Sequence, residues 1–302
     1  MALITGAIAT SDGTGNYPSF GGFSLPHLLE WAKADGGHRI TGYIAGALTL
    51  ALVAALLLKE RRRWVKRLGG IAALAVILQA VLGSLGAQRH PEIALIVSHS
   101  CLAQIYFCLT VSLAIFTHPK WRWDSAKGLD TGKPALQHVA LAFNIIVFVQ
   151  IVLGAIYRDG KQSQMGQLSG IHPAHTIGVL PHIIGGGVVF VAALWLLVRV
   201  LKASARDAGL LVLTVGLAII VMVQVFLGVG VYMMMRFSQS APHAFPGPIV
   251  PIVIATVMHV ALGALIFAGS VVVTYMTYRY AARPEVSGAP GSPLALSAEP
   301  LR

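Results

Sequence analysis

The sequence is poor in charge, and poorest in acidic residues. Only 11% of its 302 residues are charged, 56% are hydrophobic, and the mean hydropathy is +0.75. A soluble domain needs more charge than that, so the composition excludes an ordinary soluble protein. Several apolar runs exceed the roughly 18 residues that mark a membrane-spanning helix. We therefore expect an all-α polytopic membrane protein that resides in the lipid bilayer.

Cysteine is almost absent. Cys101 and Cys108 lie seven residues apart in one apolar run, on about the same helical face. Free buried cysteines are the default interpretation, and a redox or metal-binding pair is the alternative. The expected outer loops contain no cysteine, which excludes a disulfide there.

Against 11 acidic residues stand 22 Lys and Arg, giving a net charge of +11. In a soluble protein this excess would suggest nucleic acid as a partner. Here the basic residues cluster between apolar runs, as in KERRRWVKR at 59–67, so membrane topology explains them and nucleic acid is not expected. The positive-inside rule then predicts a multi-pass protein of the cell (inner) membrane with both termini cytoplasmic.

Hydropathy predicts eight spans, the first of them apparently truncated. Residues 2–10, ALITGAIAT, are too short to span and resemble the outer end of a helix. The other seven spans are expected at about 37–58, 68–87, 92–117, 136–157, 180–201, 208–235 and 249–279.

An internal repeat organises these spans. The motif Q-x-x-L-G occurs at 79–83, 150–154 and 224–228, with a weaker copy at 4–7. The even-numbered spans each carry one histidine near the outer end, and these are His38, His99, His182 and His259. Spans one to four thus repeat as five to eight, which predicts two tandem four-helix bundles related by a pseudo-two-fold axis along the membrane normal.

The repeat also divides the chain. We expect an N-terminal half at 1–118, a cytoplasmic linker at 119–135, a C-terminal half at 136–283 and a disordered tail at 284–302, which is rich in Ala, Gly, Pro and Ser.

The four histidines are candidate haem ligands. An ionisable side chain within a span is costly and usually has a task, and histidine commonly ligates haem iron. Two histidines at similar depth can hold one haem from opposite faces, which predicts the pairs His38 with His99 and His182 with His259. A single buried histidine is more often a hydrogen-bonded core residue, but four matched across a repeat favour haem. His175 is the runner-up ligand.

Asp35 and Arg39 flank the first histidine. Asp35 precedes His38 by three residues, on the same face if the helix extends that far. It either orients the imidazole and serves acid–base chemistry or caps the helix. Arg39 either pairs with a haem propionate or extends towards the membrane surface.

The chain resembles the haem A synthase family over about residues 1–280. The resemblance rests on DGGHRITGYIAG, SHSCLAQIYFC, LPHIIGGGVVF, VMHVALGAL and the eight-span repeat. It implies a membrane oxidoreductase that oxidises the C8 methyl of haem O to a formyl group, giving haem A for cytochrome c oxidase assembly. It also implies that His38 and His99 hold the substrate haem O, while His182 and His259 hold haem b.

Three features depart from that family. Asp35 stands where the family commonly has glutamate, no outer-loop cysteine pair is present, and the first span is short. The expected partners are haem O, the enzyme that makes it and an unidentified electron donor, and a homo-oligomer stays open. A bis-histidine b-type cytochrome that transfers electrons without modifying haem is the alternative function. A haem-free transporter built on a parallel repeat is the third class.

Overall fold

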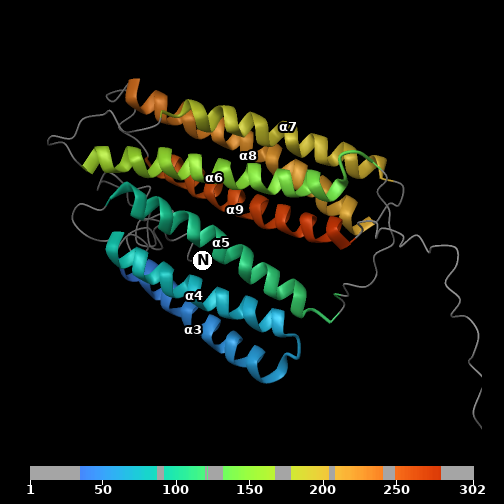
Figure 1. The fold of residues 1–302 in the computed structure, drawn as a ribbon. Coiled ribbons are helices and arrows are strands. Elements are labelled where there is room, and N and C mark those ends of the chain that lie inside the picture. The colour runs from blue at the N-terminus through green and yellow to red at the C-terminus, as the bar shows by residue number, and fades with distance from the viewer. Residues whose placement is uncertain are drawn as a thin grey trace, which may run out of the picture.

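The computed structural model describes residues 35–86, 92–119, 121, 132–166, 178–203, 208–240 and 249–279. Within these ranges all regular structure is helical. The short first span, the tail from 284 and the runner-up ligand His175 lie outside the described residues. The helices are α3 (Asp35–Lys59), α4 (Arg63–Gly86), α5 (Ile93–Thr117), α6 (Leu136–Gly166), α7 (Leu180–Lys202), α8 (Ala208–Ser240) and α9 (Ile249–Arg279), shown in Figure 1.

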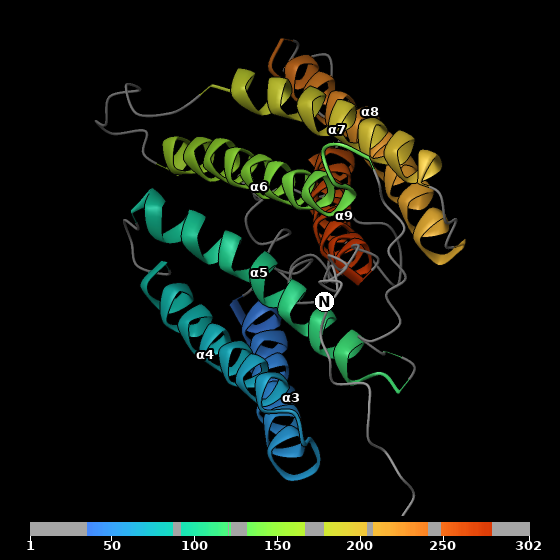
Figure 2. The ribbon, with the colours of Figure 1, turned by 45° about the vertical axis from the view of Figure 1, so that its right-hand side comes forward.

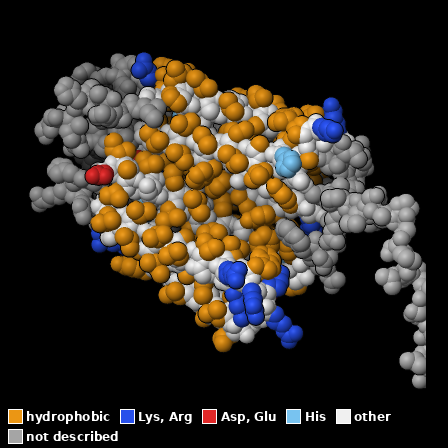
Figure 3. Space-filling view, viewed as in Figure 1, with side chains coloured by type: hydrophobic (Ala, Val, Ile, Leu, Met, Phe, Trp, Pro, Cys, Tyr) orange, Lys and Arg blue, Asp and Glu red, His pale blue; other side chains and the backbone are white. Residues whose placement is uncertain are grey.

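All seven described helices are long and apolar enough to cross a membrane. On the face shown in Figure 3, hydrophobic side chains cover the middle, and Lys and Arg gather towards the ends. The largest basic group in that view lies over the turn between α3 and α4. The prediction of a multi-pass helical membrane protein is confirmed.

Three helix boundaries differ from the hydropathy-based prediction, and one of them is the end of α8, which lies at Ser240 rather than near 235. α4 begins at Arg63 rather than near 68, because Lys66 turns back and donates a 2.9 Å hydrogen bond to the carbonyl of Leu57 at the end of α3. α6 continues to Gly166 rather than ending near 157. The charged residues Arg158 and Asp159 do not end it, because both find partners inside the protein.

The helices pack in two groups joined by α5. Helices α6 to α9 form a closed four-helix bundle in which α6 and α8 each contact both α7 and α9. Its core includes Phe143, Leu196, Val221 and Val273. α3 packs on α4, α4 packs on α5, and α5 contacts α6 and α9. Figures 1 and 2 show this arrangement from two directions.

The buried face of α5 forms the junction between the groups. Along it lie Cys101, Gln104, Cys108 and Ser112, all buried. Cys108 belongs to the core of the α6–α9 bundle, and Ser112 shares a 2.9 Å hydrogen bond with the hydroxyl of Tyr275 on α9. Both cysteines are free, as the default interpretation predicted.

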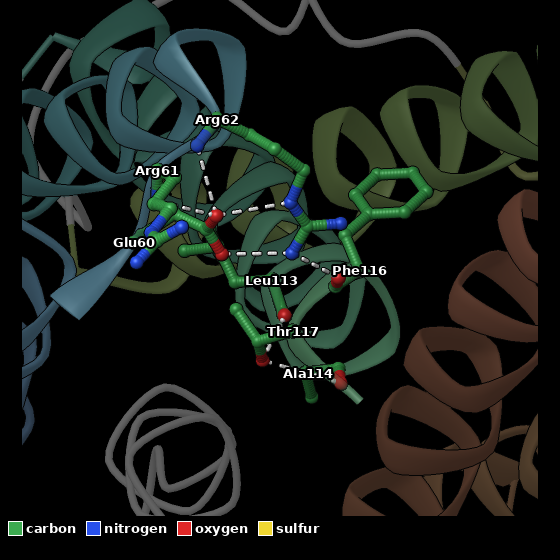
Figure 4. A network of polar contacts seen from close by, with 7 residues as sticks. All are labelled: Glu60, Arg61, Arg62, Leu113, Ala114, Phe116 and Thr117. Atoms are coloured by element: carbon green, nitrogen blue, oxygen red, sulfur yellow. Dashed lines mark hydrogen bonds and ion pairs between the residues drawn. The ribbon is translucent and has the colours of Figure 1, made fainter. Parts of the chain in front are cut away.

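An ion pair fixes the α3–α4 turn. The Arg62 guanidinium binds both carboxylate oxygens of Glu60 and donates a 2.8 Å hydrogen bond to the carbonyl of Phe116 on α5 (Figure 4). The Arg62 side chain and its backbone N–H lower the pKa of the Glu60 carboxyl from 4.5 to about 2. The hydrogen bond from Arg62 to Phe116 ties the α3–α4 turn to the end of α5. We call this end of the molecule the basic end.

Candidate functional site

The four candidate histidines come together in two pairs. The rings of His38 on α3 and His99 on α5 have centroids 6.0 Å apart and planes at 79°. The rings of His182 on α7 and His259 on α9 have centroids 6.1 Å apart and planes at 74°. All four side chains are partly buried. The structure thus brings together both pairs that the sequence proposed. We call this end of the molecule the histidine end.

The glutamine of each Q-x-x-L-G motif binds the backbone of a histidine on the following helix. In each case the side-chain amide N–H donates to the histidine carbonyl, and the pairs are Gln79 with His99 at 3.0 Å, Gln150 with His182 at 2.8 Å and Gln224 with His259 at 2.8 Å. Interhelical hydrogen bonds of this kind stabilise helix pairs within membranes. The motif therefore positions the backbone of three of the four histidines.

The glycine of each motif makes room for the histidine ring. A Cβ added at the glycine would lie close to the ring carbon Cε1: 3.0 Å for Gly83 and His99, 2.8 Å for Gly154 and His182, and 2.9 Å for Gly228 and His259. Because real Cβ atoms essentially never approach closer than 3.0 Å, a larger residue at Gly154 or Gly228 would displace the ring, and at Gly83 the ring would have to move by a few tenths of an ångström. Gln and Gly thus act together as one Gln–Gly pair for each ring, one turn apart on one helix.

A further glycine serves the second site. A methyl group at Gly185 would overlap the amide oxygen of Gln150. The Gly185 position in LPHIIGGGVVF therefore lets the Gln150 side chain reach the carbonyl of His182, since a small residue lets neighbouring helices approach closely.

The ring nitrogens are held differently from site to site. His99 Nδ1 lies 3.1 Å from the backbone carbonyl of Gln79 and can donate a proton there, while His99 Nε2 lies 3.4 Å from the side-chain amide nitrogen of Gln79. Metal-binding histidines are commonly oriented in this way. His182 Nδ1 lies 3.0 Å from the Gln150 amide nitrogen, and His259 Nδ1 has no hydrogen-bond partner among the described atoms.

The spacing of the rings fits a metal bound between two imidazoles. A metal–imidazole bond is about 2.0–2.1 Å long, so two such bonds plus the two ring radii place the centroids roughly 6 Å apart. The observed 6.0 and 6.1 Å agree with this. Among the described residues no group of three or more His, Cys, Asp or Glu lies together. Each pair of imidazoles could hold a haem, which supplies four nitrogens of its own.

The other predicted site residues are placed only in part. α3 begins at Asp35, so Asp35 and His38 lie one turn apart on the same helix, as the catalytic interpretation requires. The Asp35 side chain itself lies outside the described atoms. Arg39 is exposed beside His38.

A buried charged group next to His99 was not predicted. The carboxylate of Asp159 on α6 accepts hydrogen bonds from Arg158 Nε at 2.7 Å and from the hydroxyl of Ser100 at 3.2 Å. Arg158 also donates to Ser100 at 3.0 Å. Asp159 is 1% exposed. A usable signal was present in the sequence: Asp159 is the one acidic residue between Asp130 and Asp207.

No protein-family model matches this chain, and no curated protein matches it either.

Proposed function

We propose that this chain is a membrane haem protein with two bis-histidine sites, which oxidises the C8 methyl of haem O to the formyl group of haem A. The observation that carries the haem proposal is the pair of matched ring separations, 6.0 and 6.1 Å, on four different helices. The oxidation is supported by the resemblance of the four histidine-containing motifs to haem A synthases. The product would serve cytochrome c oxidase assembly.

The same proposal includes the finer architecture: eight spans in two tandem four-helix bundles about a pseudo-two-fold axis, in the cell membrane with both termini cytoplasmic. Equivalent contacts support it. His38, Gln79, Gly83 and His99 would correspond to His182, Gln224, Gly228 and His259, and the contacts within the two sets agree closely. The basic α3–α4 turn at the opposite end from the histidines supports the orientation.

The chain's own residues would divide the work. His38 and His99 hold the substrate haem O, and the Gln79–Gly83 pair fixes His99. His182 and His259 hold haem b, which supplies one-electron chemistry when bound. The Asp35 carboxylate, one turn from His38, holds or moves a proton at the edge of the substrate.

The decisive experiment is pigment extraction with mass analysis after co-expression with a source of haem O. Haem A or a hydroxylated haem O in the extract is the expected result. Unmodified haem alone would favour the bis-histidine cytochrome. A purified protein without a haem Soret band would refute both and favour the haem-free transporter.

Single histidine variants test the ligand assignment. His182→Ala is expected to remove stable haem from the second site and leave the first occupied. His138→Ala is a matched control, because His138 is an exposed histidine of α6 far along the helix from Gly154. Retention of a full two-haem, bis-histidine spectrum by His182→Ala would contradict the assignment.

A further inference from the structure

The two proposed haem sites differ in one buried charge. Ser100, which follows the ligand candidate His99 on α5, donates its hydroxyl to Asp159 on α6. The Asp159 side chain is fully buried, while its partner Arg158 is 21% exposed. The carboxylate is thus the more deeply buried member of the pair, although both side chains contact Ser100 on α5.

The field of this carboxylate reaches the first site. Asp159 is bound by the hydroxyl of Ser100, the residue that follows His99 on α5, and its side chain is fully shielded from water. The Arg158–Asp159 pair is neutral as a whole, but the guanidinium is partly exposed while the carboxylate is fully buried, so water screens the positive charge more than the negative one. Two charges that are shielded from water interact more strongly than the same charges at the same separation in water.

The second site has no equivalent charge from its own three remaining helices. The sequences of α7, α8 and α9 contain no aspartate or glutamate. The position after His259 is Val260, where the first site has Ser100. Asp159 lies on α6 of the second group, but its hydrogen bonds run to Arg158 and to α5.

We propose that Asp159 is a positioning residue that sets the reduction potential of the haem held by His38 and His99 and so makes that site electronically different from the second. This inference rests on the proposed haem sites. A negative charge beside a ligand stabilises the oxidised, more positive iron, so Asp159 lowers the potential of the first site. The consequence is that the haem at the site where the substrate would be oxidised gives up an electron more readily than it would without Asp159.

Purified holoprotein carrying both haems provides the test, by optical redox titration. His182→Ala, which keeps only the first haem, assigns the two transitions. Asp159→Asn should raise the midpoint potential of the first haem by the amount that corresponds to a roughly tenfold change in its oxidation equilibrium. The midpoint potential of the second haem should not change. Arg158→Lys keeps both charges and should leave both midpoints unmoved.

Glu60→Gln is the matched control, because it makes the same carboxylate-to-amide change in an arginine-bound residue at the basic end. It should shift neither midpoint. Should Asp159→Asn not accumulate, because it leaves Arg158 without its carboxylate, the double variant Arg158→Gln with Asp159→Asn removes both charges and is still expected to raise the first midpoint.

Several results would overturn the inference. One is an Asp159→Asn variant whose midpoint potentials shift equally at both sites, or do not shift at the first. Another is a Ser100→Ala variant, which loses a hydrogen bond but no charge, with the same shift as Asp159→Asn. The last is loss of the first haem from both Asp159 variants. A wild-type protein that binds no haem refutes the proposed function instead, so the two failures are distinguishable.

Discussion

Gly228 and Gly230 lie two residues apart on α8 and offer a direct test of how the histidine rings are held. A Cβ added at Gly228 would lie 2.9 Å from Cε1 of His259 and 3.5 Å from its Nδ1. A Cβ added at Gly230 would meet nothing within 4 Å. Gly228→Ala should therefore displace the His259 ring, whereas Gly230→Ala should be accommodated.

The expected size of the effect follows from two opposing terms. Forcing a methyl group into packed space costs about 1–3 kcal/mol. Replacing a helical glycine by alanine recovers about 0.5–1 kcal/mol from backbone entropy and propensity. Gly230→Ala should thus be neutral or stabilising, and Gly228→Ala should be less stable than it by about 1–3 kcal/mol.

The assay is haem content and low-spin spectrum after purification, together with thermal unfolding, for both variants in parallel. Gly228→Ala should lose haem from the second site selectively, because the displaced ring can no longer reach the iron. The reasoning is refuted if the two variants retain haem equally and unfold at the same temperature.

Three further predictions concern other parts of the chain. Gln224→Leu removes the hydrogen bond from the side-chain amide to the His259 carbonyl and should lower the free energy of unfolding by about 0.6–1.7 kcal/mol. Gln224→Asn should have the same effect, because its side chain is too short to reach that carbonyl. Asp35→Asn should still bind substrate haem but yield little haem A, because an amide cannot take or hold a proton as a carboxylate can; a full yield measured in the same preparation would leave only the helix-cap role. Because the pKa of the Glu60 carboxyl falls from 4.5 to about 2 in the folded chain, its ionised form stabilises the fold fully above about pH 4.5, and this stabilisation is lost as the pH falls through about 2. Unfolding of Glu60→Gln and wild type should therefore differ at pH 6 and converge near pH 2, and a constant difference would contradict the pKa.

The spans and the paired histidines were predictable from sequence, because long apolar runs have few alternatives to a membrane helix. Helix ends were less predictable. Hydropathy treats Lys66 and Arg158 as loop residues, yet the first caps the preceding helix and the second pairs with a buried carboxylate. A charged side chain can stay within a helix wherever it finds a partner, and here the contacts to another helix are those of Lys66 with Leu57 and of Arg158 and Asp159 with Ser100. Those contacts are invisible in the local sequence.

The Q-x-x-L-G repeat was found in the sequence without a role. Its role depends on which helices are neighbours, since Gln79 and Gly83 act on His99 of the next helix. Nothing in the five letters indicates that the glutamine reaches a backbone carbonyl or that the glycine accommodates an imidazole. The sequence alone therefore does not link the motif to the histidines, although the backbone position of three of them depends on it.

The two sites are not independent modules, because α6 contributes to both. Gln150 and Gly154 on α6 position His182 of the second site. About one turn further on, Asp159 of the same helix binds Ser100 beside His99 of the first. A helix is stiff over one turn, so a shift of α6 that altered the His182 contacts would also move the carboxylate against α5. The junction between α5 and α6 is thus where a change at one site is expected to be felt at the other.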